Sequence, residues 1–356
     1  GADIIRLDAV TYMWCELGTT CALLEESHIL VRLFRAVLNV VAPQVALITE
    51  TNVPHEDNIS YFGDGSNEAQ MVYNFALPPL VLQAFQMEDV RRLSEWAASL
   101  DPVSETATYF NFLDSHDGIG LLPVREILEP NEIDEMIRKA QTHGALISYR
   151  VDSDGKKSPY EINTTWFSAL NREDSDEPVE LQVARFLASR SIALALMGVP
   201  GIYLPSLVGS KNDTDAVLAE GEARSINRAA LDEAVLKDRL NDPGTAANQI
   251  FSAFGRMIRI RVQAPAFHPN AAQEILTGNP AVFSILRIPE PRNQAVLALT
   301  NVSDRIQSVS VSLKALGICE NEWRDLLSEG GVNADSGTLF VELKPYQIRW
   351  LTPADE

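Results

Sequence analysis

Short apolar segments alternate with helical segments over residues 4–113, and this order limits the possible folds more than any other feature. The helical segment at residues 23–41 repeats apolar side chains at helical spacing, as at Leu30, Phe34 and Val37. The strand segments are short and continuously apolar, which is typical of a parallel sheet covered by helices. We therefore predict an α/β fold with buried strands at residues 4–7, 45–49, 71–75 and 107–113 and helices at residues 23–41, 79–85 and 89–100.

Three of the predicted strands lead into carboxylates, at Asp8, Glu50 and Asp117. Because successive parallel strands present their carboxyl ends at one mouth of a (β/α)8 barrel, these side chains are expected to converge there. A doubly wound open sheet is the competing architecture, but it normally carries a glycine-rich phosphate turn early in the chain. The early part of this sequence has no such turn, so the barrel is favoured.

Converging carboxylates suggest glycoside chemistry, in which one acidic group is the nucleophile and another is the acid/base. Arg6 and Asp8 are two residues apart, so on a strand they point to the same side, and the arginine favours the charged carboxylate that a nucleophile needs. An ordinary strand-end ion pair is the alternative for these two residues alone. Glu50 ends an apolar strand, where burial would raise its pKa toward that of an acid catalyst. The pattern predicts Asp8 as nucleophile, Glu50 as acid/base and Asp117 as a group that binds sugar hydroxyls.

The rest of the sequence changes character twice. Residues 118–178 are less regular, with a helix expected at 131–143, a strand at 145–150, a turn at 152–155 and an extended segment at 160–164. The next part has a long apolar helix at 179–197, a buried strand at 200–204, a polar, turn-rich stretch at 206–241 and a helix at 246–261. From residue 264 the period becomes that of a small antiparallel sheet, with strands at 281–288, 294–300, 307–313, 337–343 and 347–351.

Composition excludes several functional classes. The net charge of −20 and the pI of about 4.7 argue against binding to nucleic acid or to an anionic membrane surface. No apolar run in the sequence is long enough to span a bilayer. The three cysteines, Cys15, Cys21 and Cys319, fit no metal-binding spacing and favour a reducing compartment, so we expect a cytoplasmic protein without a metal or cofactor.

Several short motifs resemble those of known enzymes. In this order, the sequence is similar to three motifs of glycoside hydrolase family 13, the α-amylase superfamily: RLDA at 6–9, TE at 49–50 and SHD at 115–117. Four motifs look more specifically like the sucrose phosphorylase branch: FALPPL at 75–80, HDGIG at 116–120, PYEIN at 159–163 and RSINR at 224–228. Within that branch, TETNVPH at 49–55 and NISYFG at 58–63 are similar to the glucosylglycerate phosphorylases.

This resemblance implies a retaining glycosyltransferase that works by double displacement. Asp8 would attack the anomeric carbon of an α-glucoside while Glu50 protonates the leaving group, and inorganic phosphate as co-substrate would then take the glucosyl unit as α-glucose 1-phosphate. The resemblance assigns the glucosyl ring or transition state to Arg6, His116, Asp117 and Arg224, a phosphate contact to Tyr160, and the acceptor site to Tyr12, Asn52 and Glu161.

Two of these positions indicate which acceptor molecule the enzyme would use. Sucrose phosphorylases tend to carry histidine and glutamine where this chain has Asn52 and Glu161, which favours another acceptor such as glycerate. Sucrose and glucosylglycerol phosphorylases are the alternatives within the branch. A hydrolase of the same superfamily and an inactive fragment that binds sugar or a partner chain are the alternatives outside it.

In the same family, further strands and a subdomain precede the Arg6–Asp8 motif. The resemblance therefore implies an incomplete (β/α)8 barrel that holds the last five strands, formed by residues 1–117 and 179–263, with an inserted subdomain at 118–178 and a C-terminal antiparallel β domain at 264–356. We expect unpaired sheet edges, exposed apolar surface and little or no activity from the isolated chain. Assembly as a homodimer is left open.

Overall fold

A five-stranded parallel sheet organises the amino-terminal half of the protein. The computed structural model describes residues 1–151, 155–290 and 294–354. The strand order is β1-β2-β3-β4-β8, formed by β1 (Ile4–Leu7), β2 (Ala46–Thr49), β3 (Met71–Tyr73), β4 (Thr108–Asn111) and β8 (Val199–Pro200). Parallel pairing places Leu7 opposite Thr49 and Val72 opposite Tyr109, so the strands end at a common edge. The predicted parallel sheet is thus confirmed.

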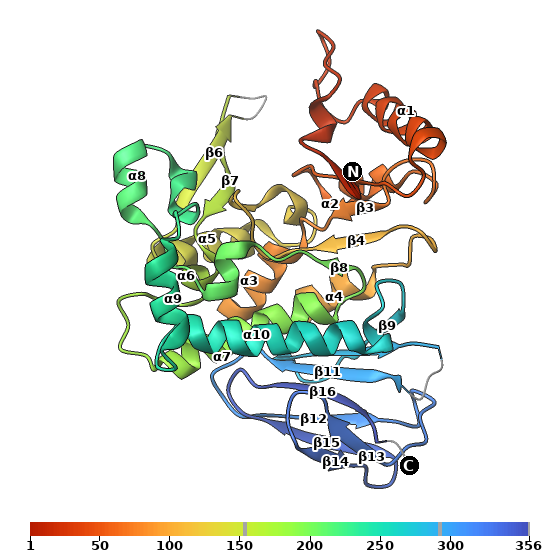
Figure 1. Ribbon diagram of the computed structural model, residues 1–356, viewed down its shortest axis with the longest axis vertical. Helices are drawn as coiled ribbons and strands as arrows, with labels where there is room; N and C mark the ends of the chain where they lie inside the picture. The colour runs from red at the N-terminus through yellow and green to blue at the C-terminus, as the bar shows by residue number, and fades with distance from the viewer. Residues whose placement is uncertain (152–154, 291–293, 355–356) are drawn as a thin grey trace.

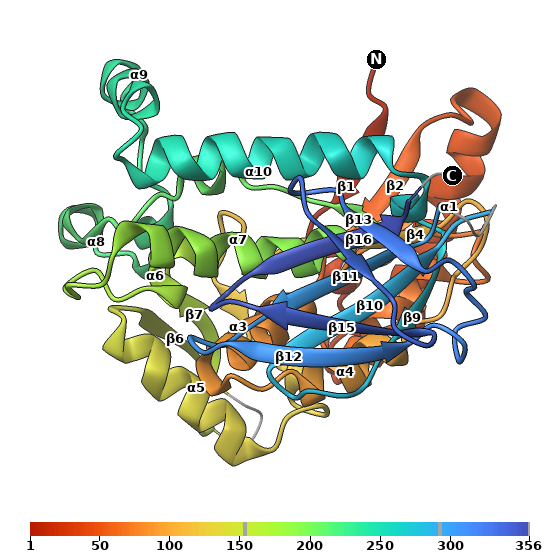
Figure 2. The same cartoon turned by 90° about the horizontal axis from the view of Figure 1, so that it is seen from below.

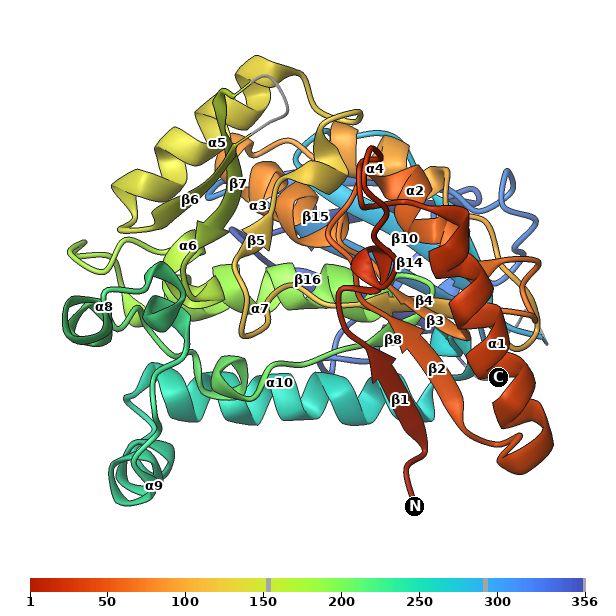
Figure 3. The same cartoon turned by 90° about the horizontal axis from the view of Figure 1, so that it is seen from above.

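Helices connect these strands and cover the sheet (Figures 1 and 3). The helices that precede or follow its strands are α1 (Glu25–Val41), α2 (His55–Ile59), α3 (Leu77–Met87), α4 (Arg91–Ala98), α7 (Val179–Ala195) and α10 (Ala246–Gln263). Pro78 and Pro79 lie in the first turn of α3, where backbone N–H groups have no intrahelical acceptor and proline is tolerated. Residues 77–85 of this helix are all buried, which makes α3 part of the main core.

Strand β1 is exposed, so the prediction of a buried first strand is wrong. It stands at the end of the strand order, and the exposed fractions of Ile4 and Ile5 are 51% and 37%. Apolar side chains of α1 are exposed as well, including Leu33 at 53% and Val40 at 83%. Figure 3 shows β1 at the end of the sheet and α1 on the far side of β2 from it. The expected exposed apolar surface is therefore present along β1 and α1.

Residues 119–170 form a small separate layer. Its antiparallel sheet has the order β5-β7-β6, and its elements are β5 (Ile119–Gly120), α5 (Pro130–Thr142), β6 (Leu146–Val151), β7 (Lys157–Asn163) and α6 (Trp166–Leu170). Glu129 and Glu132 form a capping box that begins α5. The turn predicted at 152–155 falls mainly on residues 152–154, which lie outside the described residues.

Two further predictions about residues 199–241 are wrong. The buried strand expected at 200–204 is limited to the half-buried Val199–Pro200. Gly201 N–H still donates to the Asn111 backbone oxygen at 2.6 Å, but the chain then enters the 3₁₀ turn that begins at Leu204, with a proline in its first turn. The stretch expected to be turn-rich contains the helices α8 (Thr214–Glu220) and α9 (Glu233–Asn241). Asp213 and Asp232 cap these helices, and such polar caps resemble turns when only the sequence is read.

The C-terminal part is an antiparallel β domain, as predicted, and its two sheets form a sandwich. One sheet has the order β14-β13-β16-β11-β10-β9 and packs on a β12-β15 pair. The strands are β9 (Ala272–Ile275), β10 (Val282–Ile288), β11 (Val296–Asn301), β12 (Gln307–Ser312), β13 (Glu322–Asp325), β14 (Gly331–Asn333), β15 (Thr338–Leu343) and β16 (Ile348–Pro353), of which β9, β13 and β14 were not predicted. Figures 1 and 2 show this sandwich against α7 and α10. The Trp350 indole N–H donates to the Ser191 hydroxyl of α7 at 2.9 Å, which joins the two parts.

Short 3₁₀ turns complete the fold, at η1 (Val10–Tyr12), η2 (Ser60–Phe62), η3 (Leu122–Val124), η4 (Leu204–Val208), η5 (Ala223–Asn227) and η6 (Pro265–Phe267). None of the helices in the described part of the chain is both long and apolar enough to cross a membrane.

Candidate active site

Asp8 and Glu50 lie side by side because β1 and β2 are parallel and in register. Each residue directly follows its strand, after the paired Leu7 and Thr49. The Ala9 backbone N–H donates to Glu50 Oε2 at 2.9 Å, which holds this carboxylate against the first turn after β1. The side chains therefore meet at the carboxyl edge of the parallel sheet, where the sequence predicted them.

Arg6 joins the two carboxylates. Its Nη1 lies 2.7 Å from Asp8 Oδ1, and its Nη2 lies 3.6 Å from Glu50 Oε2. Burial alone would lower the pKa of Arg6, but Tyr73, Glu50 and Asp8 together raise it. Arg6 therefore stays charged and fixes the positions of both acidic groups.

The two carboxylates have different environments. The Asp8 side chain is 72% exposed, whereas that of Glu50 is 12% exposed. Burial raises the pKa of Glu50, and the Asp8 and Asp117 carboxylates add to this rise, although the Ala9 N–H and Arg6 oppose it. The structure thus pairs an exposed, ion-paired carboxylate with a buried one that holds a proton more readily.

Tyr73 belongs to this group and was missed by the sequence analysis. The Arg6 guanidinium lies 5.5 Å from the centre of its ring, within the range of a cation–π contact. Burial raises the pKa of Tyr73 although Arg6 opposes this rise, so its hydroxyl keeps its proton over a wider pH range than that of a free tyrosine. The signal available in the sequence was its place at the end of β3, beside the strand that delivers Glu50.

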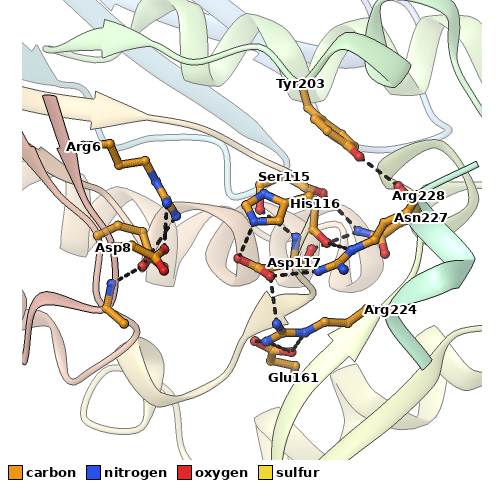
Figure 4. Close-up of polar contacts among 12 residues, drawn as sticks. Arg6, Asp8, Ser115, His116, Asp117, Glu161, Tyr203, Arg224, Asn227 and Arg228 are labelled. Carbon is orange, nitrogen blue, oxygen red and sulfur yellow. Dashed lines mark hydrogen bonds and ion pairs between the residues drawn. The ribbon is translucent and has the colours of Figure 1, made fainter. Parts of the chain in front are cut away.

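Asp117 is the centre of a second group, drawn in Figure 4. Its Oδ1 lies 2.9 Å from Arg224 Nη1 and 3.3 Å from Arg228 Nη2, and its Oδ2 lies 3.5 Å from His116 Nε2. Figure 4 shows Asp8 and Asp117 on facing sides of one space. Together with the effect of Asp117 on the pKa of Glu50, this places the two groups at one site.

Glu161 on β7 holds Arg224 from the other side. Arg224 Nη2 donates to Glu161 Oε1 at 2.7 Å and its Nε donates to Oε2 at 3.1 Å, a two-point contact that fixes the guanidinium plane. Glu161 is 3% exposed, and burial raises its pKa, whereas the hydrogen bonds from Arg224 oppose that rise. Arg224 is therefore shared between Glu161 and Asp117.

Tyr160, Asn52 and Tyr12 form the third part of the site. Burial raises the pKa of Tyr160 to about 12, with Glu161 and Tyr12 adding to the rise and a hydrogen bond with Asn52 opposing it. Asn52 packs on Gly120, where a Cβ would lie 2.5 Å from Asn52 Oδ1. That oxygen is buried and has no hydrogen-bond partner among the described residues. The structure thus brings all ten predicted site residues to neighbouring positions, while their roles stay predictions.

The loop that carries Asp117 is held by residues that the sequence analysis did not assign to the site. Asn227 donates from Nδ2 to the backbone oxygens of Ser115 and Asp117, each at 3.0 Å. The Tyr203 hydroxyl donates to the backbone oxygen of Asn227 at 3.2 Å. Arg228 Nε donates to the His116 oxygen at 2.6 Å. The RSINR motif was the signal that could have identified Asn227 and Arg228, since it already contained Arg224.

The described residues contain no group of three or more His, Cys, Asp or Glu side chains that could hold a metal ion. The acidic groups of this site bind arginines, an arrangement that can carry proton transfer and nucleophilic attack.

Comparisons with known proteins agree with the motifs. No family model matches the sequence. The chain is 44% identical to the glucosylglycerate phosphorylase of Allomeiothermus silvanus over 353 residues, which covers 99% of this chain and 60% of that protein. It is 41% identical to the glucosylglycerate phosphorylase of Escherichia coli K12, and this match also covers 99% of this chain and 60% of that protein.

Among solved structures, the fold resembles sucrose 6F-phosphate phosphorylase from Thermoanaerobacter thermosaccharolyticum, with a TM-score of 0.69 at 22% identity over 84% of this chain and 56% of that one. The chain spans 60% of the length of the curated relatives named above. At 41–44% identity over 99% of its own length, it is a homologue of the glucosylglycerate phosphorylases, as its motifs predicted.

Proposed function

We propose that this chain carries the catalytic carboxylates of a retaining glucosyl phosphorylase, which converts an α-glucoside of glycerate and inorganic phosphate to α-glucose 1-phosphate and glycerate. The observation that carries the proposal is the difference in environment between the two carboxylates at the sheet edge. Asp8 is exposed and bound to Arg6, whereas Glu50 is buried with a raised pKa. A nucleophile must be an anion that can reach carbon, and an acid must keep its proton, so the two environments fit two different roles.

In the first step, Asp8 attacks the anomeric carbon while Glu50 donates its proton to the departing glycerate oxygen. A covalent glucosyl ester forms on Asp8, and glycerate leaves. In the second step, a phosphate oxygen attacks the same carbon, Glu50 takes the phosphate proton, and the bond to Asp8 breaks. Two inversions give overall retention, and Glu50 returns to its protonated state. Asp117, fixed by Arg224 and Arg228, binds the glucosyl hydroxyls.

Residues around the predicted acceptor site are suited to bind phosphate and glycerate, the two groups that exchange on the glucosyl unit. The Tyr160 hydroxyl is protonated at neutral pH and can donate to a phosphate oxygen, and burial, which raises its pKa to about 12, keeps it protonated in alkaline solution as well. The buried, unpartnered Asn52 Oδ1 can accept a hydrogen bond from an acceptor hydroxyl. Arg228 is partly exposed beside Asp117, so its positive charge is available to a carboxylate or phosphate that enters the site.

We also propose that the five parallel strands are part of a (β/α)8 barrel formed by residues 1–117 and 179–263, with an inserted subdomain at 118–178 and a C-terminal β domain at 264–356. The open edges at β1 and β8 and the exposed apolar residues of β1 and α1 support this arrangement. A barrel completed by further strands would cover that surface. We therefore expect the 356-residue chain by itself to show little or no activity. A cytoplasmic location fits an enzyme that uses inorganic phosphate.

The test compares the chain alone with a fusion in which the amino-terminal part of the Allomeiothermus silvanus relative precedes Gly1. Each protein is incubated with α-glucose 1-phosphate and D-glycerate, and released phosphate is measured. We expect release from the fusion and not from its Asp8→Asn variant. Release with fructose or glycerol but not with glycerate would change the acceptor and keep the reaction class. No release with any of these acceptors, from a folded fusion, would refute the proposal.

Hydrolysis is a second candidate, because the 72% exposed Asp8 leaves room for water to reach a covalent intermediate. The two reactions give different products from the same glucoside in phosphate buffer. A phosphorylase accumulates α-glucose 1-phosphate, whereas a hydrolase accumulates glucose. Replacing Tyr160 by Phe should move the product ratio toward glucose if Tyr160 binds phosphate.

A further inference from the structure

The surroundings of Glu161 differ from those of a residue that binds an acceptor, the role that the family resemblance assigns to it. Glu161 lies on β7, the middle strand of the small sheet, opposite Gly120 of β5 and Ser148 of β6. Backbone pairing on both sides fixes its position, and its side chain is only 4% exposed. Little of this side chain is therefore open to a molecule that enters the site.

Both carboxylate oxygens of Glu161 accept hydrogen bonds from one arginine. Arg224 Nη2 donates to Oε1 at 2.7 Å and to Oε2 at 2.9 Å, and Arg224 Nε donates to Oε2 at 3.1 Å. A two-point contact with a planar guanidinium specifies its orientation as well as its position. The remaining nitrogen, Nη1, lies 2.9 Å from Asp117 Oδ1, and Figure 4 shows Arg224 between the two acids.

The chain that follows Asp117 also packs against this glutamate. Gly118 comes directly after Asp117, and a Cβ on Gly118 would lie 3.0 Å from Glu161 Cβ. Glycine at this position lets the two backbones approach closely. Residues 119–120 then form β5, which pairs with β7. Glu161 is thus connected to the loop that carries Asp117 in two ways, through Arg224 and through the strand pair.

We propose that Glu161 is a positioning residue and does not bind the acceptor: it holds Arg224, which in turn fixes Asp117 toward the glucosyl unit. This inference rests on the proposed function, in which Asp117 binds the glucosyl hydroxyls. Charge balance gives the same carboxylate a second task. Asp117 has two arginine partners, because Arg228 Nη2 lies 3.3 Å from its Oδ1, and Glu161 supplies the negative charge that compensates the second arginine.

Glutamine at position 161 would separate the two roles. The amide keeps one carbonyl oxygen for Arg224, but its other end is a donor, so the two-point contact and the compensating charge are both lost. The Arg224 side chain is 39% exposed, so without this contact its guanidinium can turn toward solvent and leave Asp117. A positioning role therefore predicts damage on the glucosyl side of the site, before any acceptor takes part.

Fluoride release from α-glucosyl fluoride isolates the glucosyl side, because glycerate is absent from this step. The active fusion is used in excess over substrate, so that a single turnover is followed. We expect Glu161→Gln to slow release on the order of 10–100-fold, the cost of a misplaced group in the site. Asn52→Ala should instead raise the KM for glycerate more than it slows fluoride release. Glu126→Gln replaces an exposed glutamate of the same small layer and should leave both values unchanged.

The action through Arg224 is tested by combining substitutions. Because Glu161 acts through this arginine, the Glu161→Gln/Arg224→Gln double variant should release fluoride about as slowly as Arg224→Gln alone. Losses that multiply in the double variant would contradict the proposal. A Glu161→Gln variant that releases fluoride at the parent rate while its KM for glycerate rises would overturn it and return Glu161 to the acceptor site.

The pairing has a readout that needs no activity. In the chain alone, Glu161→Gln and Arg224→Gln should each lower the free energy of unfolding, and the double variant should lose less than the sum of the two, since no unpaired charge remains. Additive losses would overturn the pairing on which the proposal depends. A folded fusion of the parent sequence that releases no fluoride would refute the proposed function and, with it, the role given to Glu161.

Discussion

Asp8 and Glu50 show how two carboxylates on adjacent strands acquire different properties. Glu50 follows the buried strand β2, whereas Asp8 follows the edge strand β1 and stays open to solvent. Arg6 contacts both, so removing either acid also changes the surroundings of the other. Two predictions at the scale of single residues follow from this geometry, and each uses the active fusion described above.

Replacing Glu50 by Gln should lower kcat/KM for phosphorolysis by about 10²–10⁴-fold, the usual contribution of a positioned acid. The same variant should recover much of its rate in forming the glucosyl intermediate from α-glucosyl fluoride, because fluoride leaves without a proton. Glu56→Gln is the matched control, since Glu56 is exposed on the neighbouring helix α2. A variant that is equally slow with both substrates would contradict the acid role.

The pH dependence of kcat/KM tests the electrostatic role of Arg6. Only protonated Glu50 donates, so activity should fall as pH rises through the pKa of Glu50, which is raised mainly by burial. Arg6 lowers that pKa, and its removal in Arg6→Gln should move the falling limb to higher pH. Arg6→Lys keeps the positive charge and should move it less. A limb that stays in place or moves to lower pH would refute this role.

At the scale of structural elements, a buried ion pair fixes the loop after β4 to helix α7. Arg190 Nη1 lies 2.8 Å from Asp114 Oδ1, and the two side chains are 2% and 8% exposed. Ser206 also bonds to both groups. This contact lies just before Ser115 and Asp117, so α7 helps to position the loop that carries the candidate sugar-binding residues.

Arg190→Met should therefore reduce the free energy of unfolding by about 3–5 kcal/mol, because the Asp114 charge would be left buried without its partner. Urea unfolding followed by circular dichroism measures the change. The Asp114→Asn/Arg190→Met double variant should lose less, since no unpaired charge remains. Arg138→Met removes an exposed ion pair with Glu135 and should change the free energy by at most about 1 kcal/mol.

At the scale of the whole molecule, β1 and α1 are the elements on which several apolar side chains remain exposed to solvent. Ile29, Leu33 and Val37 are 52%, 53% and 50% exposed along one helix, and Ile4 on the adjacent strand is also exposed. Exposed apolar side chains and an open strand edge both promote association. The isolated chain should therefore associate as its concentration rises.

A Leu33→Glu/Val37→Lys variant should weaken this association without lowering the thermal midpoint, because both side chains are already half exposed and the net charge is unchanged. Light scattering after size exclusion measures the mass. Leu218→Glu on α8 is the control, since Leu218 is 83% exposed on a separate helix and should have little effect. Equal association of all three proteins would place the contact elsewhere.

The accuracy of the sequence predictions depended on how local each signal was. The apolar runs identified β2, β3 and β4 to within two residues at either end, because burial on both faces leaves a clear local pattern. The helices α8 and α9 were missed because they are polar and have no buried residues, so no apolar stripe marks them. Burial of β1 was predicted wrongly, since an edge strand can have the same apolar sequence as an enclosed one.

The sequence by itself determined that acidic residues follow parallel strands, and its motifs identified the segments that carry His116, Tyr160 and Arg224. Only the tertiary structure decided which charges meet. Arg224 reaches Glu161 across 63 residues of sequence, and Arg190 reaches Asp114 across 76. Such pairs depend on how separate elements pack, because a side chain's neighbours across a fold leave no periodic pattern in either segment. Strand order and helix packing therefore set the electrostatic character of residues whose positions the sequence had already indicated.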